Sequence, residues 1–530
     1  MKLKKILCAL MAAAMTCSLA ACGSGSGSTS TAGASASASA AGSAAATADT
    51  ITIGRAYDSD NLDPVQMTGN YNIWVIDLML EGLVQSSDDG KTIEPLLATD
   101  WTISDDEKTY TFNLKPGVCF SDGTPVTGAD WVFSFERAMS LPDSYWGFTV
   151  ENIDSVEAPS DTTFVVHLKK ASPATLANLA MFSCGVQEKA YHDKVGEDGY
   201  ADGFIGTGPY VLSEWKKGES MTFTANPYYH IQGLPKTKTI VLRVIADDNS
   251  RVMQLQSGDI DAAINLSMDS LYQLEKDTRV NTIASEGCET RFISLNTKNQ
   301  YLSDPLVRQA LSMATDPTAI TKVATYGYGT PSSTVLPMTS AFVDPSAKVN
   351  TADVAGAKAL LQKAGYSDGE IKLDLLVCAG KTFEASVATL LKEQWAQIGV
   401  DVEIDSLEKT TYTDHLYGMN FDAVVDYWTD DTTDPFEFMN YLCNYDLCSG
   451  FDTNYSVPGI ADLNAQADAE MDAAKRTDLY NQIQQAMAAA YIYIPICTLP
   501  YANATSTSVS GFVQTPLGNL RLANMIKTVQ

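Results

Sequence analysis

The segment Phe112–Ala138 reads FNLKPGVCFSDGTPVTGADWVFSFERA and carries a dense set of local structure signals. Its first residues end a strand-like run. The stretches KPG and SDGTP that follow are turn sequences, because Gly and Pro suit the backbone of turns. A helix is then expected with Thr127 as its N-cap and Asp130 three residues later, the spacing of a capping box. The segment therefore predicts a strand, two turns and a capped helix.

The flanking regions add strands and helices on both sides. Thr50–Gly54 alternates like an opening strand, and Tyr71–Val84 has apolar residues at helical spacing, which predicts a helix against a core. Residues 291–490 alternate strand-like runs with helical patterns. Asp304-Pro305 is typical of a helix start, and Gly365 of a helix end. This alternation predicts an α/β fold.

A second stretch, Phe421–Pro435 (FDAVVDYWTDDTTDP), predicts a short strand that breaks into a loop holding Trp428 and the carboxylates of Asp430, Asp431 and Asp434. A ring beside acidic groups at a strand end suits an amphipathic cation such as the α-ammonium group of a peptide. An acidic surface loop with a packing Trp is the alternative interpretation.

The start of the chain has the pattern of a secretory signal. A basic segment and the apolar run Ile6–Ala20 lead to Leu19-Ala20-Ala21-Cys22. These four residues resemble the lipobox of bacterial lipoproteins, which implies removal of residues 1–21 and acylation of Cys22. An ordinary signal peptide with an incidental Cys22 is the alternative. Residues 22–49 are almost wholly Gly, Ser, Ala and Thr, which predicts a flexible tether that holds the folded body at the extracytoplasmic face of the cell membrane.

Charge and composition narrow the function further. With 64 acidic and 35 basic side chains, the formal net charge is −29, which argues against nucleic acid as a partner. An odd number of singly scattered Cys residues follows Cys22, which is not the pattern of a disulfide framework. The absence of a CxxC pair and the presence of only four His argue against zinc, and we expect no metal and no cofactor. Cys443 and Cys448 could close a small loop. No HExxH, GxSxG or phosphate-loop motif occurs, although with 64 acidic residues the sequence alone does not exclude a catalytic pair of carboxylates.

The first segment, together with Ala98-Thr99-Asp100-Trp101, closely resembles the signature of solute-binding proteins of the peptide/nickel class, known as family 5, which serve ABC importers. The resemblance continues in family order at residues 206–210, 226–229, 252–261, 295–297, 304–314, 326–327, 359–366, 395–402 and 421–435. It covers nearly all of residues 50–530.

The resemblance implies a periplasmic-binding-protein-like clamshell of two α/β lobes with an additional inserted lobe. Lobe I would comprise residues 50–85, 207–290 and 491–530. The inserted lobe would comprise residues 86–206, and the second clamshell lobe residues 291–490. The same resemblance implies a protein that binds without reacting, and we expect a monomer.

The resemblance also suggests ligand-binding residues. In peptide-binding members, the Asp three residues after the Trp holds the α-ammonium group of the ligand, which corresponds to Asp431 here. Trp428 would pack on the ligand and Thr429 would supply backbone hydrogen bonds, with Asp430 as the alternative if the loop register slips by one. Two further cleft candidates, for which core packing is the alternative, are Tyr57 and Tyr210.

The chain departs from the family pattern just before the Trp. Some peptide-binding members have Arg residues there that neutralise the ligand carboxylate, whereas residues 416–427 contain no Arg or Lys. Lys381, His415 or Arg291 could substitute. The leading hypothesis is a lipid-anchored protein that delivers short peptides to an ABC importer. The same fold with an oligosaccharide, a nickel chelate or another solute is the second hypothesis, and a surface hydrolase is the third.

Overall fold

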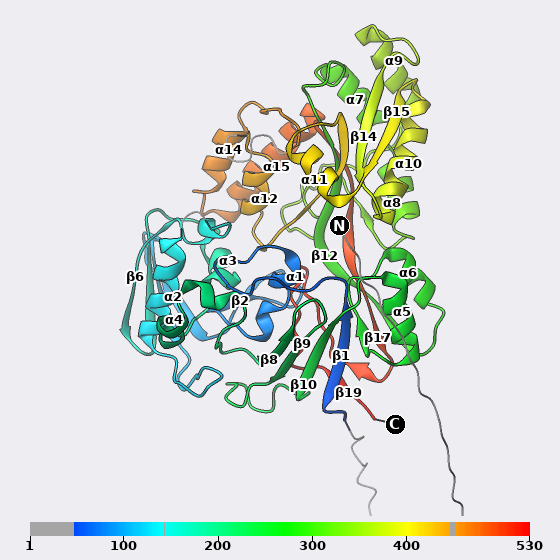
Figure 1. The fold of residues 1–530 in the computed structure, drawn as a ribbon. Helices are drawn as coiled ribbons and strands as arrows, with labels where there is room; N and C mark the ends of the chain where they lie inside the picture. Colours follow the sequence, from blue (N-terminus) through cyan, green and yellow to red (C-terminus); the bar gives the residue numbers. More distant parts are fainter. Residues whose placement is uncertain (1–46, 142–143, 446–451, 530) are drawn as a thin grey trace, which may run out of the picture. The chain divides into compact units, whose positions relative to one another are not determined.

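The computed structural model describes residues 47–141, 144–445 and 452–529, all of which belong to one folded unit that spans residues 45–530. Within these ranges the main sheet is mixed and eleven-stranded, in the order β15-β14-β16-β12-β17-β11-β1-β10-β9-β8, with β13 beside β17 (Figure 1). Its strands are β1 (Thr50–Arg55), β8 (Tyr210–Lys216), β9 (Ser220–Ala225), β10 (Thr239–Val244), β11 (Ala262–Ala263), β12 (Val280–Leu295), β13 (Thr330–Pro331), β14 (Lys372–Cys378), β15 (Asp401–Leu407), β16 (Ala423–Thr429) and β17 (Tyr493–Ser506). The mixed α/β architecture confirms the predicted fold class.

Two long antiparallel strands, β12 and β17, hold this sheet together. Their register runs from Val280↔Ser506 to Ser294↔Tyr493, with an irregularity between Ser285 and Glu289. On one side of that irregularity β17 pairs with β11, and on the other side β12 pairs with β16. The predicted lobe I and the predicted second lobe therefore share one sheet, and this pair of strands connects them (Figure 1).

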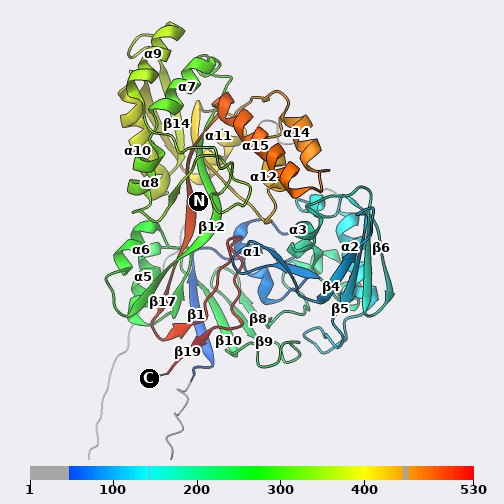
Figure 2. The ribbon, with the colours of Figure 1, turned by 180° about the vertical axis from the view of Figure 1, so that it is seen from behind.

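Helices cover both faces of the β14–β16 half of the sheet (Figure 2). On one face, mostly aliphatic residues of the strands form a core with a first set of four helices. On the other face, Phe292 packs against a second set of helices. The first set comprises α7 (Pro305–Ala314), α8 (Pro317–Ala324), α9 (Val354–Ala364) and α10 (Thr382–Ala396). The second set comprises α12 (Phe436–Tyr441), α14 (Ile460–Ala467) and α15 (Ala473–Ala490), while α11 (Lys409–Tyr417) packs on a small separate cluster beside β14 and β16. The expected helix start at Asp304-Pro305 is confirmed, as is the left-handed Gly365 that ends α9.

The β1 half of the sheet has its own cores. One core packs Ile51 and Ile53 of β1 and Phe223 of β9 against apolar residues of the segment 62–80. In a second core, α5 (Asp248–Ser257) and α6 (Met268–Leu274) pack on Ala502 and Ala504 of β17. The ends of the folded unit meet here, because Thr47 pairs with Thr528 and the Ala48 N–H donates to the Lys527 carbonyl over 2.8 Å. Lys527 belongs to β19 (Ile526–Lys527), which pairs with β18 (Val509–Ser510).

A smaller four-stranded antiparallel sheet lies within residues 86–206, in the order β4-β5-β7-β6. The capped helix predicted beside it is confirmed as α2, whose N-cap Thr127 donates its backbone N–H to Asp130 over 2.9 Å. The elements of this region are β2 (Val84–Ser86), β3 (Ile93–Pro95), β4 (Ala98–Ile103), β5 (Thr109–Leu114), α2 (Gly128–Ser140), η2 (Gly147–Thr149), β6 (Ile153–Ser160), β7 (Thr163–Leu168), α3 (Thr175–Leu179), η3 (Phe182–Cys184), α4 (Lys189–Val195) and η4 (Glu197–Tyr200).

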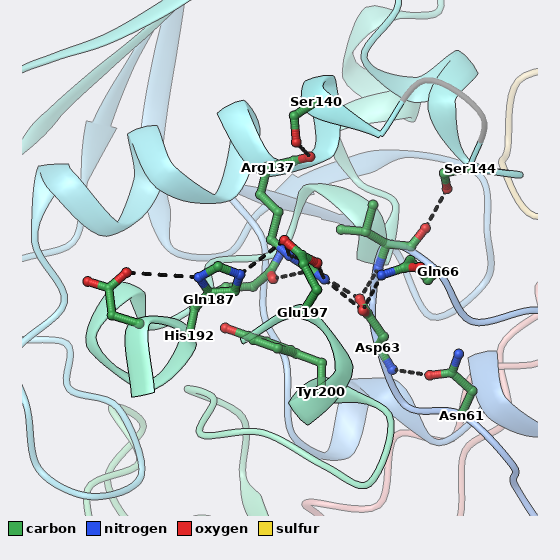
Figure 3. Close-up of polar contacts among 12 residues, drawn as sticks. Asn61, Asp63, Gln66, Arg137, Ser140, Ser144, Gln187, His192, Glu197 and Tyr200 are labelled. Atoms are coloured by element: carbon green, nitrogen blue, oxygen red, sulfur yellow. Dashed lines mark hydrogen bonds and ion pairs between the residues drawn. The ribbon is translucent and has the colours of Figure 1, made fainter. Parts of the chain in front are cut away.

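A buried guanidinium ties this region to the turn at Asn61–Pro64. Arg137 of α2 donates to both carboxylate oxygens of Asp63 over 3.0 and 2.7 Å, to Gln187 over 2.8 Å and to Glu197 (Figure 3). Its guanidinium also lies 4.6 Å from the centre of the Tyr200 ring. Arg137 and Asp63 are both buried, so each charge depends on the other.

The helix predicted over Tyr71–Val84 is wrong. The segment forms only one turn of α-helix, α1 (Asn70–Ile73), and one of 3-10 helix, η1 (Ile76–Leu78), before β2 begins. Most of its apolar residues, from Ile73 to Val84, are buried, and the Met79 carbonyl accepts the N–H of Gly208 over 2.8 Å. A Cβ on Gly206 would lie 2.0 Å from that carbonyl. Tertiary contacts therefore override the local helical pattern, and these glycines permit a close approach of two backbones. None of the helices in the described ranges combines the length and the apolar character that a membrane span requires.

Candidate ligand-binding site

The candidate site is built on the end of β16. Trp428 and Thr429 still belong to this strand, opposite Thr290 and Glu289 of β12, so the strand continues further than the sequence indicated. The acidic loop follows at Asp430. The hydroxyl of Thr429 is buried and has no hydrogen-bond partner among the described residues. The end of a central strand thus presents Trp428 and the loop beside the junction between the two halves of the sheet.

One of the three loop carboxylates has a structural role. Asp434 accepts the backbone N–H of Phe436 over 2.9 Å at the start of α12, and Arg476 of α15 donates to both of its oxygens over 2.6 and 2.7 Å. Both side chains are buried. Asp434 therefore fixes the loop to the helices and is already neutralised, which leaves the other carboxylates of the loop for a ligand.

Asp430 and Asp431 form a carboxyl cluster with Glu437 of α12. Asp430 accepts the indole N–H of Trp428 over 3.0 Å, and Glu437 accepts the backbone N–H of Asp431 over 3.0 Å. Burial raises the pKa of Asp431 to about 7. Burial, and then the neighbouring negative charges, hold the pKa values of Asp430 and Glu437 well above their usual range. Within the described residues, no Lys, Arg or His forms an ion pair with these three groups. The carboxyl cluster therefore lacks a positive charge.

Aromatic rings from distant segments line the loop. Trp428 stacks on Tyr441 of α12 with ring centres 6.2 Å apart, and Phe148 of η2 lies 6.0 Å from Tyr441 and 6.3 Å from Phe436. Neither Glu437 nor the three rings of Tyr441, Phe148 and Phe436 were candidates from the sequence. Glu437 lies only six residues after Asp431, but its role depends on the turn that Asp434 stabilises, and the approach of Phe148 is a long-range contact with no local signal.

Two cavities concern the candidate residues, and the first of them has the loop residue Asp431 in its lining. The first, which we call the acidic cavity, has a volume of about 270 Å³, and its lining includes Asp431 together with Asp77, Glu81, Asp88 and Arg521. The second, which we call the Tyr57 cavity, has a volume of about 430 Å³ and is lined by Tyr57, Trp74, Arg291, Lys381 and Tyr501, among others. Tyr501 lies near both, because the negative charge of Asp431 contributes to raising the pKa of its phenol.

The remaining sequence candidates fall into two groups. Tyr57 is exposed in the Tyr57 cavity, where the Lys381 ammonium lies 5.9 Å from the centre of its ring. Arg291 lines the same cavity but is paired with Glu289 over 2.6 Å, whereas His415 is absent from the lining.

Tyr210, in contrast, is fully buried, and its hydroxyl donates to the Thr237 carbonyl over 3.2 Å. It is a packing residue, and we do not retain it. Cys22 and Cys448 lie outside the described residues, so the acylation site and the predicted Cys443–Cys448 loop are not placed. In the part of the chain that the structure describes, no group of three or more His, Cys, Asp or Glu is arranged to hold a metal ion.

Comparisons with known proteins agree on one family. Residues 92–446 match the family described as bacterial extracellular solute-binding proteins, family 5 Middle. The probable D,D-dipeptide-binding periplasmic protein DdpA of Escherichia coli (strain K12) is 28% identical, over 88% of this chain and 92% of its own length. Di/tripeptide-binding protein 1 of Pseudomonas aeruginosa (strain UCBPP-PA14) is also 28% identical, over 86% and 90%.

A solved structure of similar shape is the ABC transporter-associated periplasmic binding protein DppA from Helicobacter pylori in complex with the peptide STSA. It has a TM-score of 0.78 and 26% identity, and the match covers 91% of this chain and 98% of that one. CtaP from Listeria monocytogenes matches with a TM-score of 0.83 at 23% identity, over 91% of this chain and 100% of that one. This chain belongs to family 5 of the bacterial extracellular solute-binding proteins, which work with the permeases of ABC importers.

Proposed function

We propose that this protein captures short peptides outside the cytoplasm and delivers them to an ABC importer. The observation that carries the proposal is the carboxyl cluster of Asp430, Asp431 and Glu437, which has no cationic partner among the described residues. Asp431 is the least buried of the three and lines a cavity, so it is the group that a ligand ammonium reaches first. The ligand ammonium would supply the missing positive charge and would donate a charge-assisted hydrogen bond to the Asp431 carboxylate.

The relatives support this ligand class. A dipeptide, a di- or tripeptide and the peptide STSA stand in the names or titles of three of them. A nickel chelate or an oligosaccharide remains the alternative ligand for this fold. The carboxyl cluster favours a cationic group over both of them, because a cation stabilises the ionised carboxylates, whereas an anionic chelate would be repelled by them and a neutral sugar would bring no balancing charge.

The carboxylate end of the peptide would meet Lys381. This residue is exposed in the Tyr57 cavity, and among the described residues it has no carboxylate partner within ion-pair distance. Tyr501 lines the Tyr57 cavity, and the negative charge of Asp431 contributes to raising the pKa of its phenol. An extended peptide would place its ammonium at Asp431 and its carboxylate towards Lys381, with Trp428 and Thr429 beside its backbone.

The remaining parts of the proposal concern the chain ends and the assembly. Acylation at Cys22 would anchor a monomer to the outer face of the cell membrane, with residues 22–49 as the tether. The folded body would divide into three lobes at the predicted boundaries. Replacement of Cys22 by Ala should then release the protein into the soluble fraction, and retention on the membrane would place the anchor elsewhere.

Mass spectrometry of the ligand released from the purified protein tests the function directly. We expect intact short peptides with free N-termini, without turnover when fresh peptide is added. Recovery of a sugar or a metal chelate in stoichiometric amount would replace the peptide by that ligand class, and cleavage products would favour a hydrolase.

A further inference from the structure

Glu81 is a buried carboxylate in the wall of the acidic cavity. It lies between η1 and β2 and has 6% of its surface exposed. Its Oε1 atom accepts the hydroxyl of Tyr229 over 3.2 Å and Nε2 of His230 over 3.0 Å. Its other oxygen, Oε2, has no hydrogen-bond partner within the described residues. A buried carboxylate oxygen without a donor is costly, which indicates that a donor arrives from elsewhere.

The partners of Glu81 indicate how its charge is balanced. The Lys115 ammonium lies 3.3 Å from Nδ1 of His230. An ammonium can only donate, so Nδ1 is the acceptor and the ring proton is on Nε2, where it donates to Glu81. Lys115 thus contacts the far edge of the imidazole ring, and among the described residues no Lys or Arg forms an ion pair with Glu81.

The rest of the cavity combines acidic groups with apolar walls. Asp77, Asp88 and Asp431 are the other carboxylates in its lining, and Arg521 is the single basic residue that the structure places there. Arg521 is already engaged, with Asp88 at 2.7 Å, Asp77 at 3.6 Å and the Ser86 carbonyl at 2.7 Å. The apolar wall is formed by Ile73, Leu80, Val513, Leu517 and Leu522. An aliphatic stem with a cationic head suits this combination, because the stem covers the apolar wall while the head meets the carboxylate.

We propose that the acidic cavity takes a basic side chain of the bound peptide, so that the protein prefers ligands whose first residue is Lys or a similar diamino acid. The inference rests on the proposed function, since it places the α-ammonium group at Asp431 and the side-chain ammonium at Glu81. Two carboxylates in one cavity then meet two ammonium groups on one residue. An acidic side chain at the same position would meet four carboxylates and an arginine that is already paired.

Calorimetric titration of the purified, ligand-free protein with three dipeptides tests the preference: Lys-Ala, its Nε-acetyl derivative, and norleucine-Ala, which keeps the stem and lacks the ammonium. We expect Lys-Ala to bind at least about tenfold more tightly than the other two, as a hydrogen bond to a charged group implies. Equal affinity for all three would overturn the inference and leave the peptide function standing. Binding of none of them at millimolar concentration, while the protein is folded, would count against both.

The variant Glu81→Gln tests whether Glu81 is the residue that causes the preference for Lys-Ala. The amide keeps the acceptor for Tyr229 and His230 but removes the charge. We expect it to bind norleucine-Ala as the wild type does and to lose the preference for Lys-Ala. Asp88→Asn is the matched control, because Asp88 lines the same cavity at its exposed rim and pairs with Arg521. It should retain the preference. If Glu81→Gln retains it and Asp88→Asn loses it, the side-chain ammonium binds at the rim and the assignment to Glu81 is wrong.

Discussion

At the scale of single residues, the proposed ammonium site is Asp431 rather than its neighbour Asp430. Both follow Trp428, but Asp430 is buried and accepts the indole N–H, whereas Asp431 is half-buried and lines the acidic cavity. The position of Asp431 in the family motif and its place in the cavity lining both favour Asp431 as the proposed ligand contact. An enclosed site strengthens the charge pair because water screens it less.

Asp431→Asn should weaken binding of peptides with a free N-terminus by roughly a hundredfold or more, because the ligand ammonium is left buried without its partner. Calorimetric titration measures this change. N-acetylated peptides should bind poorly to the wild type and gain nothing from the substitution. Asp430→Asn keeps an acceptor for Trp428 and is the control, with a smaller effect. Unchanged affinity of Asp431→Asn for free peptides would contradict the ammonium site.

The pKa of Asp431, about 7, gives binding a pH dependence. Only the ionised carboxylate pairs with an ammonium, so affinity should rise with pH up to about pH 7 and fall again above about pH 8 as peptide α-amino groups lose their protons. Titrations at pH 6.5 in buffers of different ionisation enthalpy should show proton release on binding. Affinity that is constant from pH 5.5 to 7.5 would show that Asp431 is ionised throughout.

In the ligand-free protein the raised pKa of Asp431 acts on stability, which should fall as the pH rises, whereas the affinity for peptide rises. The folded state holds a proton on Asp431 that the unfolded chain releases near its ordinary pKa of 3.8. Stability from this group is therefore present at low pH and is lost as the pH rises towards 7. Ligand-free Asp431→Asn should lose less thermal stability than the wild type between pH 5 and 8, which melting curves at both values would detect.

At the scale of elements, the sequence predicted those units whose signals are local. The opening strand, the capped helix after Thr127 and the helix that begins at Asp304-Pro305 all have caps or alternation that act within a few residues. The predicted helix over Tyr71–Val84 failed because the Met79 carbonyl bonds to Gly208 from a distant part of the chain. In the site, the sequence indicated the end of β16 with Trp428 and the acidic loop after it, whereas Glu437, Tyr441 and Phe148 approach through α12 and η2 and had no such signal.

The contact between α2 and the Asn61–Pro64 turn supports a stability prediction. Arg137→Met leaves the buried carboxylate of Asp63 without its partner, which should cost about 3–5 kcal/mol of unfolding free energy. Chemical denaturation measures the change. The double variant Arg137→Met, Asp63→Asn removes the unpaired charge and should recover much of the loss. A double variant as unstable as Arg137→Met would show that packing of the arginine stem, not charge, is what matters.

At the scale of the whole molecule, the two halves of the sheet are joined through β12 and β17, with their irregularity between Ser285 and Glu289. Gly287 lies in that interval, where a Cβ would come within 2.4 Å of the Leu499 carbonyl. A junction of so few strands allows the halves to rotate about it. The proposed ligand contacts, Asp431 and Lys381 on one half and Tyr57 and Glu81 on the other, lie on both sides of this junction.

Binding should therefore make the molecule more compact. Small-angle scattering with saturating peptide should give a smaller radius of gyration than scattering of the ligand-free protein. Asp431→Asn at the same peptide concentration is the control and should keep the larger radius. An unchanged radius for a wild type that calorimetry shows to be saturated would remove closure from the mechanism.

Lys381→Ala tests the far end of the ligand. The wild type should bind peptides with a free carboxylate about tenfold more tightly than their C-terminal amides, because one charge-assisted contact is lost in the amide. The variant should bind both equally in the same titration. His415→Ala is the matched control, since His415 lies outside the lining of the Tyr57 cavity, and it should keep the discrimination. Discrimination that persists in Lys381→Ala would assign the carboxylate to another group.

The pairing of Thr47 with Thr528 makes the fold suitable for circular permutation. Because the first and last described segments meet at this bridge, the chain could be closed there by a short linker and opened at an exposed loop elsewhere, with the same contacts still able to form. Circular permutants of residues 47–529 should thus keep the ligand site, and a reporter domain fused at the C-terminus would sit beside the entry of the chain, away from the loop that follows β16.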